Sequence, residues 1–204
     1  PAPLTLFPGI SQLPPAHYLL CPRKDPVQLT RYWDIERAFD GGEQADARLE
    51  RLLSDAVRLR LVSDVEVGAF LSGGVDSSAI VAWMQRHAVT PVKTFAATFL
   101  ETPYNEARQA RSAAETLGTK HYEQVVQSGD INLLPEIVWH SEELTADSSM
   151  LALYRLAQRA REEVKVVLTG DGADEVFGGY STYMATWLAG IYRRVPGVLR
   201  KNLI

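Results

Sequence analysis

Cysteine is nearly absent from this sequence, because Cys21 is the single example in 204 residues. One thiol cannot form an internal disulfide or a cysteine-based zinc site, and this low content is typical of a reducing cytoplasm. The sequence also lacks any apolar run of about 18 residues or more, so we expect no membrane-spanning helix and no membrane partner. We therefore predict a cytoplasmic protein.

Positive charge is not in excess either. Lys and Arg number 21 against 25 Asp and Glu, which gives a formal net charge of −4. Nucleic-acid-binding domains carry clustered positive charge, so this balance predicts no nucleic-acid partner. Low-complexity stretches, internal repeats and heptad runs are missing as well, which excludes fibrous and disordered classes. Hydrophobic residues make up 46% of the chain, enough for the sizeable core of about one domain.

Residues 1–42 differ in composition from the rest of the chain. Seven of the 11 prolines fall in the first 26 residues, and proline is excluded from helix interiors because it lacks a backbone donor. We predict turns and two short strands here, over residues 16–20 and 30–35, followed by a domain boundary. The chain starts at Pro1 without a signal peptide, which predicts a fragment or a processed chain.

From residue 43 onward, the hydrophobic pattern alternates between helical and strand periods. An apolar stripe from Leu49 to Leu61 predicts the first helix. Asn105 is expected to cap a later helix, which Gly118 should end. Helices are predicted over residues 43–61, 77–86, 106–117, 131–140 and 150–163, and strands over 65–71, 92–99, 122–126 and 164–168. This alternation predicts an α/β fold with a doubly wound, mainly parallel sheet and helices on both faces.

The first strand of this alternation leads into a turn rich in glycine and serine, Ser72-Gly73-Gly74-Val75-Asp76-Ser77-Ser78. Ligands of doubly wound sheets bind beyond the carboxyl ends of strands, and a glycine-rich helix start favours an anion. The turn lacks the Gly-Lys-Ser/Thr ending of a Walker loop. The Asp76 carboxylate would repel phosphate unless a metal ion lies between them, so we infer Mg²⁺. A capped glycine turn without a ligand is the structural alternative.

A second cluster of acids follows the fourth strand, in Thr169-Gly170-Asp171-Gly172-Ala173-Asp174-Glu175. These acids stand where a parallel sheet places chemistry, although acids at a helix start are also favourable on their own. Adjacent strand ends would bring Asp76 and Asp174 together as ligands of one Mg²⁺. The metal would neutralise charge on a bound phosphate or pyrophosphate group.

Residues 72–78 resemble the PP-loop of the ATP pyrophosphatases, whose pattern is Ser-Gly-Gly-x-Asp-Ser-Ser. Residues 169–180 resemble a segment of the glutamine-dependent asparagine synthetases, Ser-Gly-Asp/Glu-Gly-x-Asp-Glu-x-Phe-Gly-Gly-Tyr, and similarity extends through residues 104–107, 117–121 and 142–149. The resemblance implies a fold of the adenine nucleotide alpha hydrolase type. It also implies a ligase that uses ATP to activate a carboxylate as an acyl-adenylate, releases pyrophosphate and forms an amide with ammonia.

The same resemblance implies the site residues. Asp171 and Glu175 would be catalytic, and Asp76 and Asp174 would hold Mg²⁺. ATP and its pyrophosphate portion would be bound by Phe70, Leu71, Ser72, Gly73, Gly74, Asp76, Ser77, Ser78, Ala97, Thr169 and Gly170. Residues 1–42 would be the C-terminal remnant of a glutaminase domain with its linker, and residues 43–204 a synthetase domain truncated at its C-terminal end.

Departures from the family pattern leave the substrate open. The glutaminase nucleophile, an N-terminal cysteine, has no counterpart because Cys21 is internal, and the family's downstream lysine has none either. Leu144 and Ser148 replace residues that are commonly proline near the acceptor pocket. Aspartate is the default substrate, another carboxylate in metabolite, peptide or polysaccharide tailoring is the alternative, and a non-catalytic nucleotide-binding remnant is the third reading. Expected partners are small molecules, including ammonia from glutamine, and a homodimer is left open.

Overall fold

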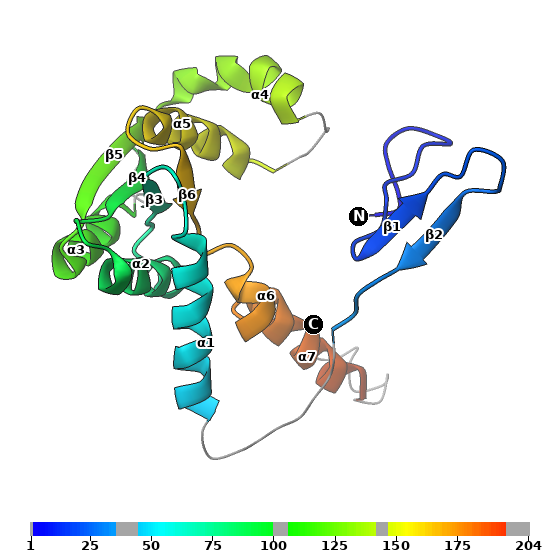
Figure 1. The fold of residues 1–204 in the computed structure, drawn as a ribbon, viewed down its shortest axis with the longest axis horizontal. Coiled ribbons are helices and arrows are strands. Elements are labelled where there is room, and N and C mark those ends of the chain that lie inside the picture. The colour runs from blue at the N-terminus through cyan, green and yellow to red at the C-terminus, as the bar shows by residue number, and fades with distance from the viewer. Residues whose placement is uncertain (1, 36–44, 100–105, 142–146, 195–204) are drawn as a thin grey trace, which may run out of the picture.

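The computed structural model describes residues 2–35, 45–99, 106–141 and 147–194. Its elements are β1 (His17–Leu20), β2 (Gln28–Arg31), α1 (Ala45–Arg60), β3 (Val67–Phe70), α2 (Val75–His87), β4 (Lys93–Phe99), α3 (Ala107–Leu117), β5 (Lys120–Val126), the 3₁₀ helix η2 (Ser128–Leu133), α4 (Leu134–Ser141), α5 (Ser149–Arg161), β6 (Val166–Leu168), α6 (Ala173–Phe177) and α7 (Ser181–Arg194). Figure 1 shows the β1–β2 hairpin apart from the parallel sheet and its helices. Within the described ranges, every helix is too short or too polar to cross a bilayer.

Four strands form the central sheet, in the order β5-β4-β3-β6. All of its pairings are parallel: Ala69 of β3 lies opposite Thr94 of β4 on one side and opposite Leu168 of β6 on the other. A helix lies in each connection, with α2 between β3 and β4, α3 between β4 and β5, and α4 and α5 between β5 and β6. The predicted α/β fold with a parallel sheet is confirmed.

The strand order creates a topological switch point beside β3. The chain moves outward from β3 to β4 and β5, and then returns to the other side of β3 as β6. In open α/β sheets, the loops that follow the strands at such a point leave a crevice in which ligands bind. The loops after β3 and β6 contain the two motifs found in the sequence.

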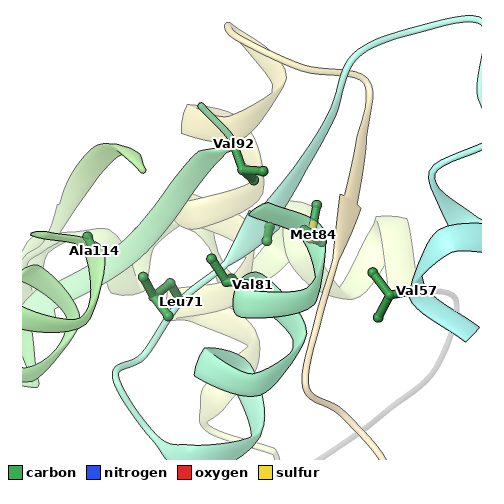
Figure 2. Packing of buried hydrophobic residues seen from close by; sticks show 7 residues of the cluster. Val57, Leu71, Val81, Met84, Val92 and Ala114 are labelled. Carbon is green, nitrogen blue, oxygen red and sulfur yellow. The ribbon is translucent and has the colours of Figure 1, made fainter. Parts of the chain in front are cut away.

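Helices cover both faces of this sheet, as predicted. On one face, α1, α2 and α3 pack on the sheet through a cluster of buried residues: Val57, Ala69, Leu71, Val81, Met84, Val92 and Ala114 (Figure 2). On the other face, α5 packs on β4 through Phe95, Leu156, Ala160 and Val164. Successive strand residues point to opposite faces, so Leu71 lies in the first cluster and Phe70 packs against the second.

The bounds predicted for the second N-terminal strand are wrong. It is β2, over Gln28–Arg31, rather than residues 30–35. Its pairing with β1 ends where His17 lies opposite Arg31, because the chain turns at Ala16, whose φ is 59°. The aromatic residues after Arg31 therefore have no partner strand in the hairpin, despite their strand propensity.

The predicted helix starts differ from those in the structure by one to three residues, and the largest difference has a clear physical reason. The helix predicted over 131–140 is an α-helix only from Leu134, preceded by the 3₁₀ turn of η2. Pro135 has no N–H to donate backward, so the preceding turn cannot continue into one α-helix. The N-cap of α3 is Glu106, while Asn105 lies outside the described residues. The predicted end of α3 is confirmed, since Gly118 is left-handed with a φ of 68°.

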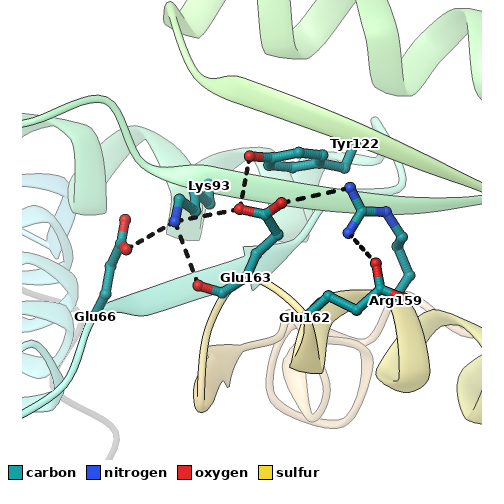
Figure 3. A network of polar contacts seen from close by, with 6 residues as sticks. All are labelled: Glu66, Lys93, Tyr122, Arg159, Glu162 and Glu163. Carbon is teal, nitrogen blue, oxygen red and sulfur yellow. Dashed lines mark hydrogen bonds and ion pairs between the residues drawn. The ribbon is translucent and has the colours of Figure 1, made fainter.

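A polar network joins the amino ends of the strands to the end of α5 (Figure 3). Lys93 Nζ lies 2.9 Å from Glu66 Oε2 and 3.4 Å from Glu163 Oε2. Tyr122 donates its hydroxyl to Glu163 Oε2 at 2.9 Å. That hydrogen bond, together with nearby Lys93, holds the pKa of the Glu163 carboxyl below its ordinary value. The network lies at the opposite end of the sheet from the switch-point loops, so we assign it to stability.

Replacing Glu163 with Gln should destabilise the fold in a pH-dependent way. A carboxyl group whose pKa is lowered by folding adds stability above its unfolded pKa, and this stability is lost as the pH falls through the folded pKa. We expect the urea midpoint of the wild type to exceed that of Glu163→Gln at neutral pH, and the difference to shrink below about pH 4. Tyr122→Phe, which removes the donor but keeps the ring stacked on Phe95, should weaken the same pH dependence. A difference that stays constant across this range would contradict the role given to Glu163.

Candidate functional site

The loops after β3 and β6 are in direct contact at the carboxyl edge of the sheet. We name residues 72–78 the glycine–serine loop and residues 169–180 the acidic segment. A Cβ atom at Gly170 would lie 2.9 Å from the backbone nitrogen of Ser77 and 3.2 Å from Cβ of Asp76. Only glycine allows so close an approach of the two backbones. The structure therefore brings together two motifs that are far apart in the sequence.

Ser77 is only 8% exposed, and its buried hydroxyl forms the hydrogen bonds that hold the glycine–serine loop in shape. Its Oγ donates to the carbonyl of Gly74 at 3.3 Å and accepts the backbone N–H of Ser72 at 3.2 Å. The Ser72 and Ser77 hydroxyl oxygens are 3.0 Å apart, and Ser72 Oγ accepts the N–H of Gly74 at 3.2 Å. Helix α2 then begins at Val75 without a side-chain cap. Its first backbone N–H groups therefore have no side-chain acceptor, which is the condition under which a helix start can bind an anion.

Gly73 fixes where this loop lies relative to α3. Its φ of +85° is in the left-handed region that favours glycine. A Cβ atom there would lie 2.6 Å from the backbone nitrogen of Ala110 and 2.7 Å from the carbonyl oxygen of Gln109. The loop therefore rests directly on the first turn of α3, and no larger residue fits at this position.

Hydroxyl groups hold two of the carboxylates in the acidic segment. Thr169 Oγ1 donates to Asp171 Oδ2 at 2.9 Å and accepts the Asp171 N–H at 3.3 Å. The first turn of α6 carries Asp174 and Glu175. Tyr180 donates its hydroxyl to Glu175 Oε1 at 2.9 Å, and this carboxylate raises the pKa of the Tyr180 phenol. Asp171 and Glu175 are therefore oriented before any ligand arrives.

The two carboxylates predicted to hold Mg²⁺ have a different environment. Neither Asp76 nor Asp174 uses its carboxylate in a hydrogen bond or ion pair with another described residue. Within the same part of the chain, no three Asp, Glu, His or Cys side chains form a metal-binding group on their own. Mg²⁺ is usually bound through one or two carboxylates together with substrate phosphates and water. Two carboxylates without other partners among the described residues are the kind of ligand that this mode uses, and here Asp76 lies on one loop and Asp174 on the other.

The remaining predicted nucleotide contacts lie on strands or directly after one. Leu71 is 1% exposed and belongs to the core, and its N–H donates to the carbonyl of Phe95 at 2.9 Å. Its side chain and N–H are therefore unavailable to a ligand. Phe70 and Ala97 are half-buried, at the end of β3 and within β4. The predicted contacts in the two loops therefore lie close together in the structure. Leu71, in contrast, could contact a nucleotide only through its carbonyl oxygen.

Sequence reasoning missed a groove beside the glycine–serine loop. It has a volume of about 550 Å³, and its lining includes Gly73, Ser78, Arg108, Gln109, Ser112 and Thr116. We name it the α2–α3 groove. A signal was present in the sequence, because α3 follows β4 and must begin at the carboxyl edge of the sheet. Side chains of its first turn, such as Arg108, therefore lie near the loop after β3.

Comparison with known proteins adds evidence from outside the structure. The asparagine synthase family model matches residues 48–203. The glutamine-hydrolysing asparagine synthetase 1 of Bacillus subtilis is 38% identical over 151 residues, which cover 74% of this chain and 24% of that protein. Amidase chry2 of Gibberella zeae is 32% identical over 91% of this chain and 31% of that protein. An ammonia-dependent NAD synthetase of Campylobacter jejuni, solved with nitrate, has a TM-score of 0.46 and 17% identity over 66% of this chain and 60% of that chain.

The matched regions show which family the chain belongs to, but they correspond to only part of each relative. The chain spans less than a third of the length of the two curated relatives, at 24% and 31%. The family match itself includes β3, both switch-point loops and β6, and it covers most of the chain. This chain belongs to the asparagine synthase family.

Proposed function

We propose that this chain binds Mg·ATP and activates a carboxylate for amide formation. The observation that carries the proposal is the contact of Gly170 with Asp76 and Ser77, which joins the two loops at the switch point. Membership of the asparagine synthase family supports an ATP-dependent, amide-forming ligase. The uncapped start of α2 supports phosphate binding at the same place.

Each part of the site has a role in this proposal. The phosphates of ATP would be bound by the first N–H groups of α2 and by Ser72, Gly73, Gly74, Ser77 and Ser78. The rest of the nucleotide would contact Phe70, Leu71, Ala97, Thr169 and Gly170. Asp76 and Asp174 would hold Mg²⁺, which when bound supplies positive charge against the phosphate oxygens.

The proposed reaction has two steps. A carboxylate oxygen of the substrate attacks the α-phosphorus of ATP, and the bond from that phosphorus to the bridging oxygen breaks. This step gives an acyl-adenylate and pyrophosphate. Ammonia then attacks the acyl carbon, AMP leaves with the electrons of its bond, and the nitrogen loses a proton. Asp171, oriented by Thr169, would accept that proton, and Glu175, oriented by Tyr180, would complete the acidic wall of the site.

Aspartate is the proposed carboxylate and glutamine the proposed source of ammonia. The name of the Bacillus subtilis relative, a glutamine-hydrolysing asparagine synthetase, supports both choices. We further propose that residues 1–42 are the end of a glutaminase domain with its linker. Residues 43–204 would then belong to the synthetase domain.

A second candidate is amide formation on another carboxylate. It is favoured by Leu144 and Ser148, which depart from the family pattern near the acceptor pocket. Leu144 lies outside the described residues, and Ser148 directly precedes α5. The similarity to a protein named an amidase gives this candidate only loose support.

Carboxylate-dependent exchange of labelled pyrophosphate into ATP tests the proposal. In the full-length protein with Mg²⁺, we expect exchange when aspartate is added and none when the acid is omitted, because exchange requires a reversible adenylation step. Exchange with a different acid, and not with aspartate, would favour the second candidate. Tight ATP binding without exchange for any acid would contradict the ligase and leave a nucleotide-binding remnant.

A further inference from the structure

The α2–α3 groove is continuous with the glycine–serine loop. Gly73 and Ser78 of that loop form one wall. The other wall is formed by residues of α3: Arg108, Gln109, Ser112, Ala113, Thr116 and Leu117. The close contact of Gly73 with the backbone of Gln109 and Ala110 holds the two walls together. A group released at the loop would therefore enter a space whose polar lining is a guanidinium, an amide and hydroxyls, beside the apolar side chains of Ala113 and Leu117.

Arg108 is the only cationic side chain among the residues that line this groove. Its guanidinium forms no hydrogen bond or ion pair within the described part of the chain, and the first turn of α3 contains no acid. Arg111, on the same helix, is different: it donates from Nε and Nη2 to the two carboxylate oxygens of Glu123, each at 2.9 Å. Glu106 precedes the helix and does not line the groove.

The chemistry of the loop decides which ligand suits this cation. Breaking the α–β phosphate bond of ATP leaves pyrophosphate, a small and highly charged anion, next to Ser78 and Gly73. A guanidinium binds phosphate oxygens in a bidentate manner, and such charge-assisted hydrogen bonds are stronger than neutral ones. Hydroxyl and amide groups along the rest of the groove add further donors.

We propose that the α2–α3 groove binds the pyrophosphate portion of the nucleotide, with Arg108 as its ligand-binding cation. This inference rests on the proposed function and adds a residue to it. Two ligands could supply this pyrophosphate group. One is bound ATP, through its two distal phosphates, and the other is the released pyrophosphate product. AMP lacks this group and should not depend on Arg108.

Binding of three probes to the full chain tests the proposal: inorganic pyrophosphate, ATP and AMP, each with Mg²⁺, by isothermal titration calorimetry. Arg108→Ala should raise the dissociation constant of pyrophosphate about tenfold, and Arg108→Lys should raise it less because lysine keeps the charge but not the fork. AMP binding should stay unchanged. The control is Arg161→Ala, which removes another exposed arginine, in the last turn of α5. An equal loss for ATP would mean that the groove holds the distal phosphates, and a loss for pyrophosphate alone would mean that it holds the product.

The outcomes separate this proposal from the function on which it rests. If Arg108→Ala binds pyrophosphate and ATP like the wild type, while Asp76→Asn loses ATP, the groove is not a pyrophosphate site and the proposed function stands. If AMP binding weakens as much as pyrophosphate binding, the effect is general charge and the proposal is also overturned. If the wild type binds neither ATP nor pyrophosphate, the proposed function itself fails.

Discussion

Asp76→Asn should raise the dissociation constant of ATP about 100-fold in the presence of Mg²⁺, which corresponds to about 2.8 kcal/mol. The substitution keeps the shape of the side chain but removes the negative charge that Mg²⁺ requires. The fold should survive, because the Asp76 carboxylate forms no hydrogen bond or ion pair with another described residue. Only its favourable place near the start of α2 is lost, at a cost of up to about 1 kcal/mol. Calorimetric ATP titrations, with circular dichroism as a check on folding, measure both effects.

Metal dependence separates this role from a general effect of charge. In EDTA, the wild type should bind ATP as weakly as Asp76→Asn, and Mg²⁺ should restore only the wild type. Asp174→Asn should resemble Asp76→Asn, and the double variant should be little worse than either one if both carboxylates hold one ion. Asp64→Asn, at an exposed position before β3, is the matched control. Unchanged Mg·ATP binding by Asp76→Asn would exclude the proposed metal site.

The glycine–serine loop could be predicted from sequence because its determinants are local. A buried strand, two glycines and a helix start follow one another within residues 65–78, and the structure has them as β3, the loop and α2. The acidic segment could be predicted for the same reason. That the two segments lie near each other was also predicted, and the pairing of β6 with β3 agrees with it. The close contact of their backbones could not be predicted, because it depends on the three-dimensional course of both loops. Gly170 is a plain turn glycine in the sequence, and only tertiary structure shows that it faces Asp76 and Ser77.

Amphipathic patterns correctly predicted helices, but they did not predict how much of each apolar face is buried. The stripe on α1 predicted a helix with an inward face, yet Val57 is 2% exposed while Leu49 and Leu52 are 40% and 53% exposed. Periodicity reports that apolar residues share a face, but it does not report what covers each turn of that face. Strand propensity fails similarly after Arg31, because a strand also needs a partner. Arg108 was missed because the start of a helix gains meaning only from the loop that lies beside it.

Gly73→Ala should destabilise the fold by on the order of 3 kcal/mol and greatly weaken ATP binding. Two effects combine at this position. An alanine at a φ of +85° is strained, which costs about 1–2 kcal/mol. The added Cβ would also lie 2.6 Å from the backbone nitrogen of Ala110, and overpacking against a fixed backbone costs about 1–3 kcal/mol more. Urea unfolding measures the loss of stability.

Two other glycines allow these effects to be separated. Gly118 has a similar positive φ of +68° but open space around its Cβ position, so Gly118→Ala isolates the backbone strain. Gly129 has open space and no positive φ, so Gly129→Ala should be close to neutral. The excess loss in Gly73→Ala over Gly118→Ala then measures the contact between the loop and α3. Because ATP is proposed to bind that loop, Gly73→Ala should lose affinity at temperatures where the variant remains folded, whereas Gly118→Ala should retain it. Equal losses of stability in these two variants would mean that α3 does not fix the position of the loop.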